Sequence, residues 1–404
     1  MSRLTSFPAL RLQRGFSIVE LMISVVIGMM ALLFATRMIT SSEQGRQAAL
    51  GGSDSMQNGM MAMFSISNDA NQAGFGLNDP ILAGCNTSLT DSGGYALAAA
   101  SRNGTAVTPL APAVIVDGGL NSDVISINSG GALAGTATVR LTGNYTGGTA
   151  LEVDREPFGF DAGDVIVVAP EKPNPASALC TLRQLSVKPP FGAAAKSLNF
   201  ASGTGFRYNS GDMPASYDGG GARVFNLGPA AKLSFHTWSV ENGYLKLRAT
   251  DIPGTGANAA AVADNIVSIK AMYGLDTRAG IAFDPEKGTK VGKWSARMNE
   301  DLDGDGVVGG SGDYQRVVAL RLAVVARSKA PERPLPGQAC NATPDAKRPV
   351  VFAAIEPAGG ADVSITPNVV IAGDAVDWKC YHYRVFETII PIRNSAWRPT
   401  AWTK

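Results

Sequence analysis

The sequence predicts an α+β protein in which one long N-terminal helix precedes a β-rich domain. An apolar run at residues 16–36 contains a single charge, Glu20, and residues 37–76 then turn polar while keeping helical spacing. Beyond residue 76, short runs alternate apolar and polar residues between glycine turns, which is typical of antiparallel sheet. The expected parts are a leader, a transmembrane half-helix, an amphipathic half-helix and a β domain with large loop insertions, at residues 1–15, 16–36, 37–76 and 77–404.

The first 15 residues are basic and end at Gly15, directly before the apolar run. This run is long enough to cross a bilayer, because about 20 apolar residues suffice for a spanning helix. A carboxylate such as Glu20 is costly in lipid, so we expect it to have a partner and a function. An ordinary signal peptide has a shorter apolar core that is followed by its cleavage site, and a plain membrane anchor needs no such glutamate.

The stretch from Arg14 to Met22 resembles the class III signal of type IV pilins and type II secretion pseudopilins, in which a basic leader, Gly, a hydrophobic residue and Glu precede an apolar helix. Gly15, Phe16 and Glu20 stand in those places. The resemblance implies a type IV pilin-like fold, cleavage by a prepilin peptidase between Gly15 and Phe16, and N-methylation of Phe16. It also implies that Glu20 pairs with the amino terminus of a neighbouring subunit during assembly.

The second half of the helix, residues 37–76, carries methionine and phenylalanine side chains spaced three or four residues apart. We interpret this stripe as the face on which the sheet packs, because such spacing places side chains on one side of a helix. Four glycines weaken the helix, each by up to about 1 kcal/mol relative to alanine, and predict a bend or a melted turn near Gly51-Gly52. The stripe comprises Met56, Met60, Met61, Met63 and Phe64.

Several segments of the β domain read as strands. Asn242-Gly243 lies between two alternating runs and is a strong hairpin signal. Residues 259–265 read as a short helical turn. Arg316–Arg327 is the most apolar candidate and should be central in its sheet, whereas Pro391 restricts the last strand to an edge or to a strand end. The predicted strands are residues 123–128, 136–141, 164–169, 182–187, 232–240, 244–247, 266–273, 316–327, 350–354 and 383–392.

The C-terminal segments resemble the family of PilW-type minor pilins, through Val262–Ser268, Met272–Asp276, Arg316–Ser328 and Tyr383–Phe386. This resemblance implies a subunit that joins other minor pilins in a priming complex at the pilus tip. The implied partners are these minor pilins, the major pilin, the prepilin peptidase, the inner-membrane assembly platform and a PilY-type tip adhesin. The implied location is the inner membrane, with a single pass and a periplasmic C-terminal domain, and then the pilus on the cell surface.

The four cysteines, Cys85, Cys180, Cys340 and Cys380, form no Cys-x-x-Cys pair. In an exported chain they predict two disulfides, for which three pairings are possible. We favour Cys340 with Cys380, because a loop followed by a strand lies between them, and this choice leaves Cys85 with Cys180.

Residues 301–306, Asp-Leu-Asp-Gly-Asp-Gly, read as the start of a calcium loop of the EF-hand type. Carboxylates at alternate positions converge on one cation, the glycine at the sixth position allows a sharp turn, and the next residue offers its carbonyl oxygen. The pattern departs at the twelfth position, where Gly312 replaces the usual glutamate. The alternative is a polar turn rich in Asp and Gly. The candidate calcium ligands are Asp301, Asp303, Asp305, Val307 and Asp313.

No catalytic motif emerges, and we expect a structural protein rather than an enzyme. His236 and His382 are the only histidines and lie in strand-like runs, so neither zinc coordination nor acid–base catalysis is indicated. The net charge of +1, without a basic cluster, argues against nucleic acid as a partner. Two alternatives remain open: a tip subunit of a type II secretion pseudopilus, and a membrane-tethered periplasmic binding module or enzyme.

Overall fold

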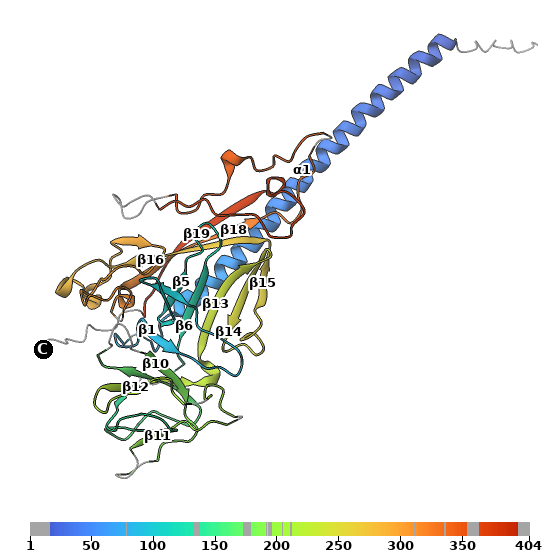
Figure 1. Ribbon diagram of the computed structural model, residues 1–404. Helices are drawn as coiled ribbons and strands as arrows, with labels where there is room; N and C mark the ends of the chain where they lie inside the picture. The colour runs from blue at the N-terminus through green and yellow to red at the C-terminus, as the bar shows by residue number, and fades with distance from the viewer. Residues whose placement is uncertain are drawn as a thin grey trace, which may run out of the picture. The chain divides into compact units, whose positions relative to one another are not determined.

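A computed structural model describes most of the chain (Figure 1). The described residues are 17–77, 79–131, 138–172, 179–190, 192, 196–203, 205–210, 212–310, 312–334, 337–353 and 363–394. Gly15 and Phe16, the predicted cleavage and methylation site, lie outside these residues.

Helix α1 is the main helix among the described residues and runs from Ile18 to Gln72 (Figure 1). The chain separates into two compact units, Met1–Leu50 and Gly51–Lys404, so α1 begins in the first unit and ends in the second. The melted turn predicted near Gly51-Gly52 is wrong, because both residues are helical, whereas a bend at this boundary between the two units stays a prediction. Gly51 lies in a close contact, because a Cβ on it would be 3.0 Å from the Cβ of Ser328.

The second unit contains three larger sheets, whose strand pairs are antiparallel except for β1 with β10. The first is β4 (Pro109–Leu110), β1 (Cys85–Ser88), β10 (Leu179–Gln184), β9 (Asp164–Pro170), β12 (Ala222–Pro229) and β7 (Thr138–Arg140). The second is β15 (Ala260–Asp264), β14 (Tyr244–Ala249), β13 (Ser234–Glu241), β6 (Val124–Ser129) and β5 (Ala113–Val116). The third is β17 (Lys293–Ser295), β16 (Ile266–Leu275), β18 (Val317–Arg327) and β19 (Tyr383–Pro391).

Two short hairpin-like pairs and several 3-10 turns complete the described secondary structure. The pairs are β2 (Ala100–Arg102) with β3 (Thr105–Val107), and β8 (Ala150–Glu152) with β11 (Ser197–Asn199). The 3-10 turns are Ala230–Lys232, Gly280–Ala282, Pro285–Lys287, Tyr314–Arg316, Asp345–Lys347 and Trp378–Cys380.

Most strand predictions agree with the structure, and the β13–β14 hairpin turns at Asn242-Gly243, both of which have positive φ. Strand β18 is interior in its sheet and β19 ends at Pro391, as expected. The predicted helical turn at residues 259–265 is wrong, because β15 pairs with β14 there. An isolated turn of helix is unfavourable in water, whereas the edge of β14 supplies backbone hydrogen-bond partners at once. The 136–141 prediction reaches outside the described residues, and β7 occupies its second half.

The face of α1 that packs against the second and third sheets consists of small residues. Ala62, Ile66 and Ala70 are almost fully buried in a cluster with side chains from both sheets, such as Ile125 and Val324. The methionine stripe was the wrong choice of face: Met56, Met60, Met61 and Phe64 are 45%, 49%, 52% and 73% exposed, and only Met63 packs partly against the core. The buried positions, three or four apart, are Gly51, Ser55, Gly59, Ala62, Ile66, Ala70 and Ala73.

Close approach explains why small residues were selected on this face. A Cβ on Gly59 would lie 2.0 Å from Cε2 of Phe386, a ring on β19 that packs partly against the core. A methionine in this position has no room, so the larger apolar side chains of α1 stay on the opposite face.

The first sheet is covered on both faces, which explains why β9 reads as a continuous apolar run. Val165 and Val167 belong to one buried cluster, whereas Ile166 and Val168 belong to another. The structure also contains both expected disulfides, Cys85–Cys180 between the neighbouring strands β1 and β10, and Cys340–Cys380.

The end of α1 is held to the second sheet by a buried charge network. His236 Nδ1 lies 2.7 Å from Asp69 Oδ2, and His236 Nε2 lies 2.8 Å from Asp251 Oδ1. Trp238 Nε1 donates a second hydrogen bond to Asp69. Burial lowers the pKa of His236, but the hydrogen bonds and charges of Asp251 and Asp69 outweigh it and raise this pKa to about 9. His236 is therefore a structural cation that links the helix to β13.

The first prediction concerns this cation. The pKa of His236 in the folded protein exceeds its usual value of 6.5. Its contribution to the free energy of unfolding is therefore complete below pH 6.5 and is lost as the pH rises through about 9. The full contribution is about 3 kcal/mol. We expect the melting temperature of the wild type to fall between pH 6.5 and 9.5 more steeply than that of His236→Gln. His382→Gln, which alters a histidine paired with the half-exposed Glu332, is the control. Equal pH slopes for wild type and His236→Gln would contradict the assignment.

The second prediction compares two glycines on one helix. Gly59→Ala should destabilise the protein, because overpacking costs about 1–3 kcal/mol and exceeds the helix-propensity gain of at most about 1 kcal/mol. Gly52→Ala is the matched control, since its new Cβ would meet only the end of the Arg384 side chain at 3.6 Å. Chemical denaturation of both variants measures the difference. If the Gly59→Ala protein is as stable as the Gly52→Ala protein, the ring of Phe386 does not restrict the size of the side chain at residue 59.

Candidate functional site

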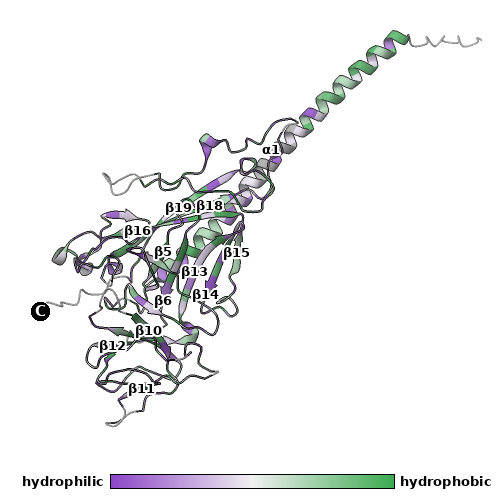
Figure 2. Cartoon of the chain, viewed as in Figure 1, coloured by the Kyte–Doolittle hydropathy of each residue, from purple (hydrophilic) through white to green (hydrophobic). Residues whose placement is uncertain are grey.

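The N-terminal part of α1 is an apolar helix with a carboxylate in its first turn. Residues Ile18–Thr40 form a stretch of 23 residues with a mean hydropathy of 2.5, long and apolar enough to span a membrane. At 1.5 Å per residue it is about 35 Å long, which exceeds the roughly 30 Å hydrocarbon core of a bilayer. The sequence predicts a transmembrane span that ends at Thr36, whereas the apolar part of the helix continues for one more turn, to Thr40. Figure 2 shows that this part of α1 is mostly coloured as hydrophobic, with a few hydrophilic positions.

The polar side chains of this segment separate into two kinds. The hydroxyls of Ser24 and Thr36 donate hydrogen bonds to helix carbonyls one turn earlier, Leu21 at 2.8 Å and Leu32 at 3.0 Å. Such internal bonds satisfy a hydroxyl without water. Glu20 and Arg37 are the charged side chains of this segment, and Glu20 lies in its first turn. An ionised carboxylate has only acceptor atoms, so it cannot bond to helix carbonyls as the two hydroxyls do, and in lipid it calls for a donor or a cation.

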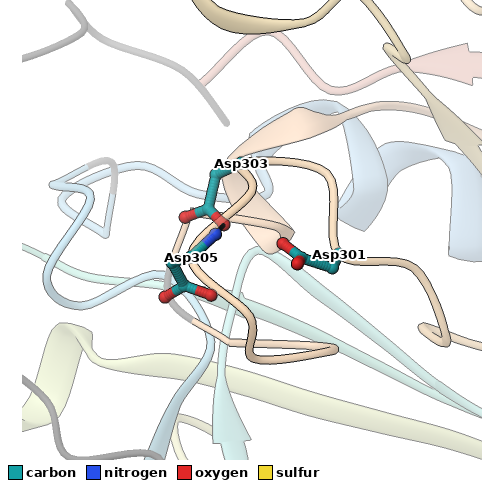
Figure 3. A group of neighbouring side chains, drawn as sticks. All are labelled: Asp301, Asp303 and Asp305. Atoms are coloured by element: carbon teal, nitrogen blue, oxygen red, sulfur yellow. Dashed lines mark hydrogen bonds between the residues drawn. The ribbon is translucent and has the colours of Figure 1, made fainter.

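A second candidate site is the loop that precedes β18. Within the described residues, Asp301, Asp303 and Asp305 form a group whose carboxylate oxygens lie within 4.8 Å of one another (Figure 3). All three are exposed. Asp301 accepts backbone hydrogen bonds from Gly304 at 2.8 Å and Gly306 at 3.0 Å, which curl the loop around its own first residue.

The other two predicted ligands are used differently. Asp313 is completely buried, and its two carboxylate oxygens accept backbone hydrogen bonds from Leu302 and Gly310. The carbonyl of Val307 accepts the Gly310 amide at 3.3 Å. Asp313 and Val307 therefore hold the backbone of the loop through hydrogen bonds. The other three of the five predicted ligands, the exposed aspartates, lie close together. The loop leads into a 3-10 turn, Tyr314–Arg316, and β18, so it lacks a following helix.

The loop concentrates negative charge. Asp303 is exposed as a whole residue, but its Oδ2 atom lies close to Gly312. A Cβ added to Gly312 would be 2.1 Å from this oxygen. Loss of hydration at this carboxyl group, together with the charges of Asp313 and Asp305, raises the pKa of Asp303 to about 7. A cation placed among these carboxylates would relieve this repulsion.

A shallow hollow of about 350 Å³ lies beside the end of β18. Its charged residues include Arg327 and Asp374, beside the ring of Trp378. Arg327 Nη1 lies 2.6 Å from Asp374 Oδ2, and Tyr381 donates a hydrogen bond to the same carboxylate. At this hollow, Arg327, Asp374 and Tyr381 therefore bind one another.

Sequence reasoning missed the residues that join the large elements. Asp69 looked like a surface residue of α1, and Asp123 and Lys270 looked like ordinary strand residues, yet each takes part in a buried ion pair. The signal for Lys270 was available: a lysine in the middle of the otherwise apolar run 266–275 must find a counter-ion when both faces of the strand are buried.

Two family models match the chain. The prokaryotic N-terminal methylation motif matches residues 10–36, which include Gly15, Phe16 and Glu20. The family described as type IV pilus-assembly protein W matches residues 237–394, from β13 to just beyond β19. No curated protein and no solved structure matches the chain. The chain therefore combines a methylation motif and a long N-terminal helix with a C-terminal region that is similar to the PilW family, and it resembles a PilW-like type IV pilin.

Proposed function

We propose that this pilin is a minor subunit that takes part in initiating type IV pilus assembly, within a complex of minor pilins at the pilus tip. The observation that carries the proposal is the presence, in one chain, of the methylation motif at residues 10–36 and the match to the pilus-assembly family at residues 237–394. The protein acts as a structural subunit rather than as an enzyme.

The physical basis of assembly is the transfer of an apolar helix from lipid to a bundle of like helices. Before assembly, the segment Ile18–Thr40 lies in the inner membrane and the β domain lies in the periplasm, where disulfides form. Burying Glu20 among helices requires a cation, because an unpaired carboxylate in such surroundings is costly. The methylated amino terminus of a neighbouring subunit supplies this charge once the prepilin peptidase has released it.

The exposed apolar face of α1 in the second unit supports the same role. Met56, Met60, Met61 and Phe64 lie opposite the buried small residues and are about half exposed or more. An apolar patch of this kind is uncommon on a monomer and marks an interaction surface. Assembly with other minor pilins and the major pilin, through the inner-membrane platform, covers this face, and the complex then carries a PilY-type adhesin to the cell surface.

The third prediction tests Glu20. Glu20→Gln should leave leader cleavage intact, so that mass spectrometry of the N-terminal peptide still finds methylated Phe16. It should reduce surface pili and twitching motility to near the level of a deletion strain, because the pairing charge is lost. Ser24→Ala, which removes a hydroxyl satisfied inside the same helix, is the matched control and should assemble normally.

Two outcomes would contradict this function. Normal pili and motility in the Glu20→Gln strain would show that the carboxylate is not an assembly residue. Normal pili with defective protein secretion in a deletion strain would identify the protein as a type II secretion pseudopilin instead.

We also propose that the loop of Asp301, Asp303 and Asp305 binds calcium. Three carboxylates within 4.8 Å of one another offer the oxygen ligands that this cation prefers, and waters would complete its coordination. The bound cation would fix the loop that precedes β18.

The fourth prediction follows from this proposal. Millimolar calcium should raise the melting temperature of the detergent-solubilised protein and give a saturable signal in isothermal titration. Asp301→Asn should remove both effects, because Asp301 both contributes a ligand and curls the loop. Asp345→Asn is the control, since Asp345 forms an exposed ion pair with Lys379 elsewhere on the domain. The absence of heat and of any melting shift in the wild type would exclude the site.

A further inference from the structure

Lys270 lies in the middle of β16 with its side chain completely buried. Its ammonium group directly contacts Oδ1 of Asp123, which is also completely buried and immediately precedes β6. The two residues are 147 positions apart in the chain and belong to different sheets. The pair thus holds the side-chain nitrogen of Lys270 next to the carboxyl group of Asp123, away from water.

The carboxyl group of Asp123 is held by backbone donors on both oxygens. Gly118 donates to Oδ1 at 2.9 Å, and Ala271 donates to Oδ2 at 2.9 Å. Ala271 directly follows Lys270, so the same stretch of β16 supplies the amine and fixes the carboxyl group. Two N–H donors withdraw electron density from the carboxyl carbon and fix the plane of the group, as they do for a carbonyl under attack. Burial also raises the pKa of Asp123, although Lys270 opposes this rise.

A second carboxylate completes the arrangement. Asp117 Oδ1 lies 3.5 Å from Lys270 Nζ, and Asp117 Oδ2 is held by Arg297 at 2.7 Å. Lys270 Nζ also donates to the carbonyl oxygens of Gly119 at 2.9 Å and Asn121 at 3.2 Å. The amine is therefore orientated from several sides, with one carboxyl group as its nearest contact and a separate carboxylate within reach of its protons.

The geometry points to an intramolecular isopeptide bond between Nζ of Lys270 and Cγ of Asp123, with Asp117 as the proton carrier. An ion pair and its neutral form differ only by transfer of one proton, here from the Lys270 ammonium to Oδ1 of Asp123. After this transfer both groups are uncharged, so neither leaves an unpaired charge in the interior. The free amine is the nucleophile that the step requires.

The reaction balances without an oxidant or a cofactor. The Nζ–Cγ bond forms and the Cγ–Oδ1 bond breaks. Of the two protons that remain on the amine, one stays in the new amide. The other passes through Asp117 to the departing Oδ1, which already carries the first transferred proton and leaves as water. Oδ2 becomes the amide oxygen and keeps its hydrogen bond from the Ala271 amide.

Such a bond would covalently join the start of β6 in the second sheet to the middle of β16 in the third sheet. The two disulfides do not connect these sheets: Cys85–Cys180 lies in the first sheet, and Cys340–Cys380 joins the loop after β18 to the turn before β19. An amide link resists both reduction and pulling force, which suits a subunit of an external filament.

The fifth prediction is read directly from the mass of tryptic peptides of the full-length wild-type protein. Trypsin cleaves after lysine and arginine, so Asp123 lies in peptide 103–140 and Lys270 separates peptides 249–270 and 271–278. With the bond, Lys270 resists cleavage. Peptides 103–140 and 249–278 should then appear as one branched species, lighter than their sum by one water molecule.

Lys246 provides an internal control in the same digest, because it forms an ion pair with Glu241 at 2.6 Å in which the glutamate is largely exposed to water. Normal cleavage is expected after Lys246. Lys270→Arg keeps a cation but has no amine that can form this amide, and it should abolish the branched species completely. Complete cleavage after Lys270 in the wild type, together with an unmodified peptide 103–140, would overturn the proposal and leave a buried ion pair.

Discussion

The close contact between the second half of α1 and two β-sheets is the constraint on which the rest of this structure depends. Gly59 lies against the ring of Phe386 and Gly51 lies against Ser328, with no space for larger side chains. Interiors are packed as densely as organic crystals, so the residues on this face are set by the available volume rather than by hydrophobicity alone. As a consequence, the large apolar residues of the helix are displaced to the exposed face, where other subunits can cover them.

Buried charges fix how the elements meet. His236 is held between Asp69 of α1 and Asp251, and Lys270 of β16 is held by Asp123 at the start of β6. Both networks join segments that are far apart in the chain. A buried ion is costly unless its partners are in place, so such pairs discriminate against other arrangements of helix and sheets more than they add stability. The His236 network therefore fixes the helix end on the second sheet, and the Lys270 pair fixes the start of β6 on β16.

The two candidate sites have different physical demands. Glu20 lies in an apolar helix, and we propose that it pairs with a charge that another molecule brings. The aspartate loop works in water and repels itself until a cation or a proton arrives, as the raised pKa of Asp303 shows.

The sequence by itself determined the features that depend on local chemistry. The apolar run with Glu20, the Asn242-Gly243 hairpin and the central position of β18 are encoded in consecutive residues, because periodicity and turn preferences act over short distances. The three aspartates of the loop were found for the same reason, since alternate spacing alone brings their carboxylates together.

Only the tertiary structure decided which face of α1 is buried, that β15 is a strand, and that Asp313 holds the loop from within. Each of these depends on a neighbour distant in sequence: Phe386 excludes a methionine from the helix face, β14 offers its edge to residues 260–264, and the amides of Leu302 and Gly310 occupy the Asp313 carboxylate. The contact of Lys270 with Asp123 is of the same kind, because packing free energy is set by which surfaces meet, and a linear pattern does not contain that information.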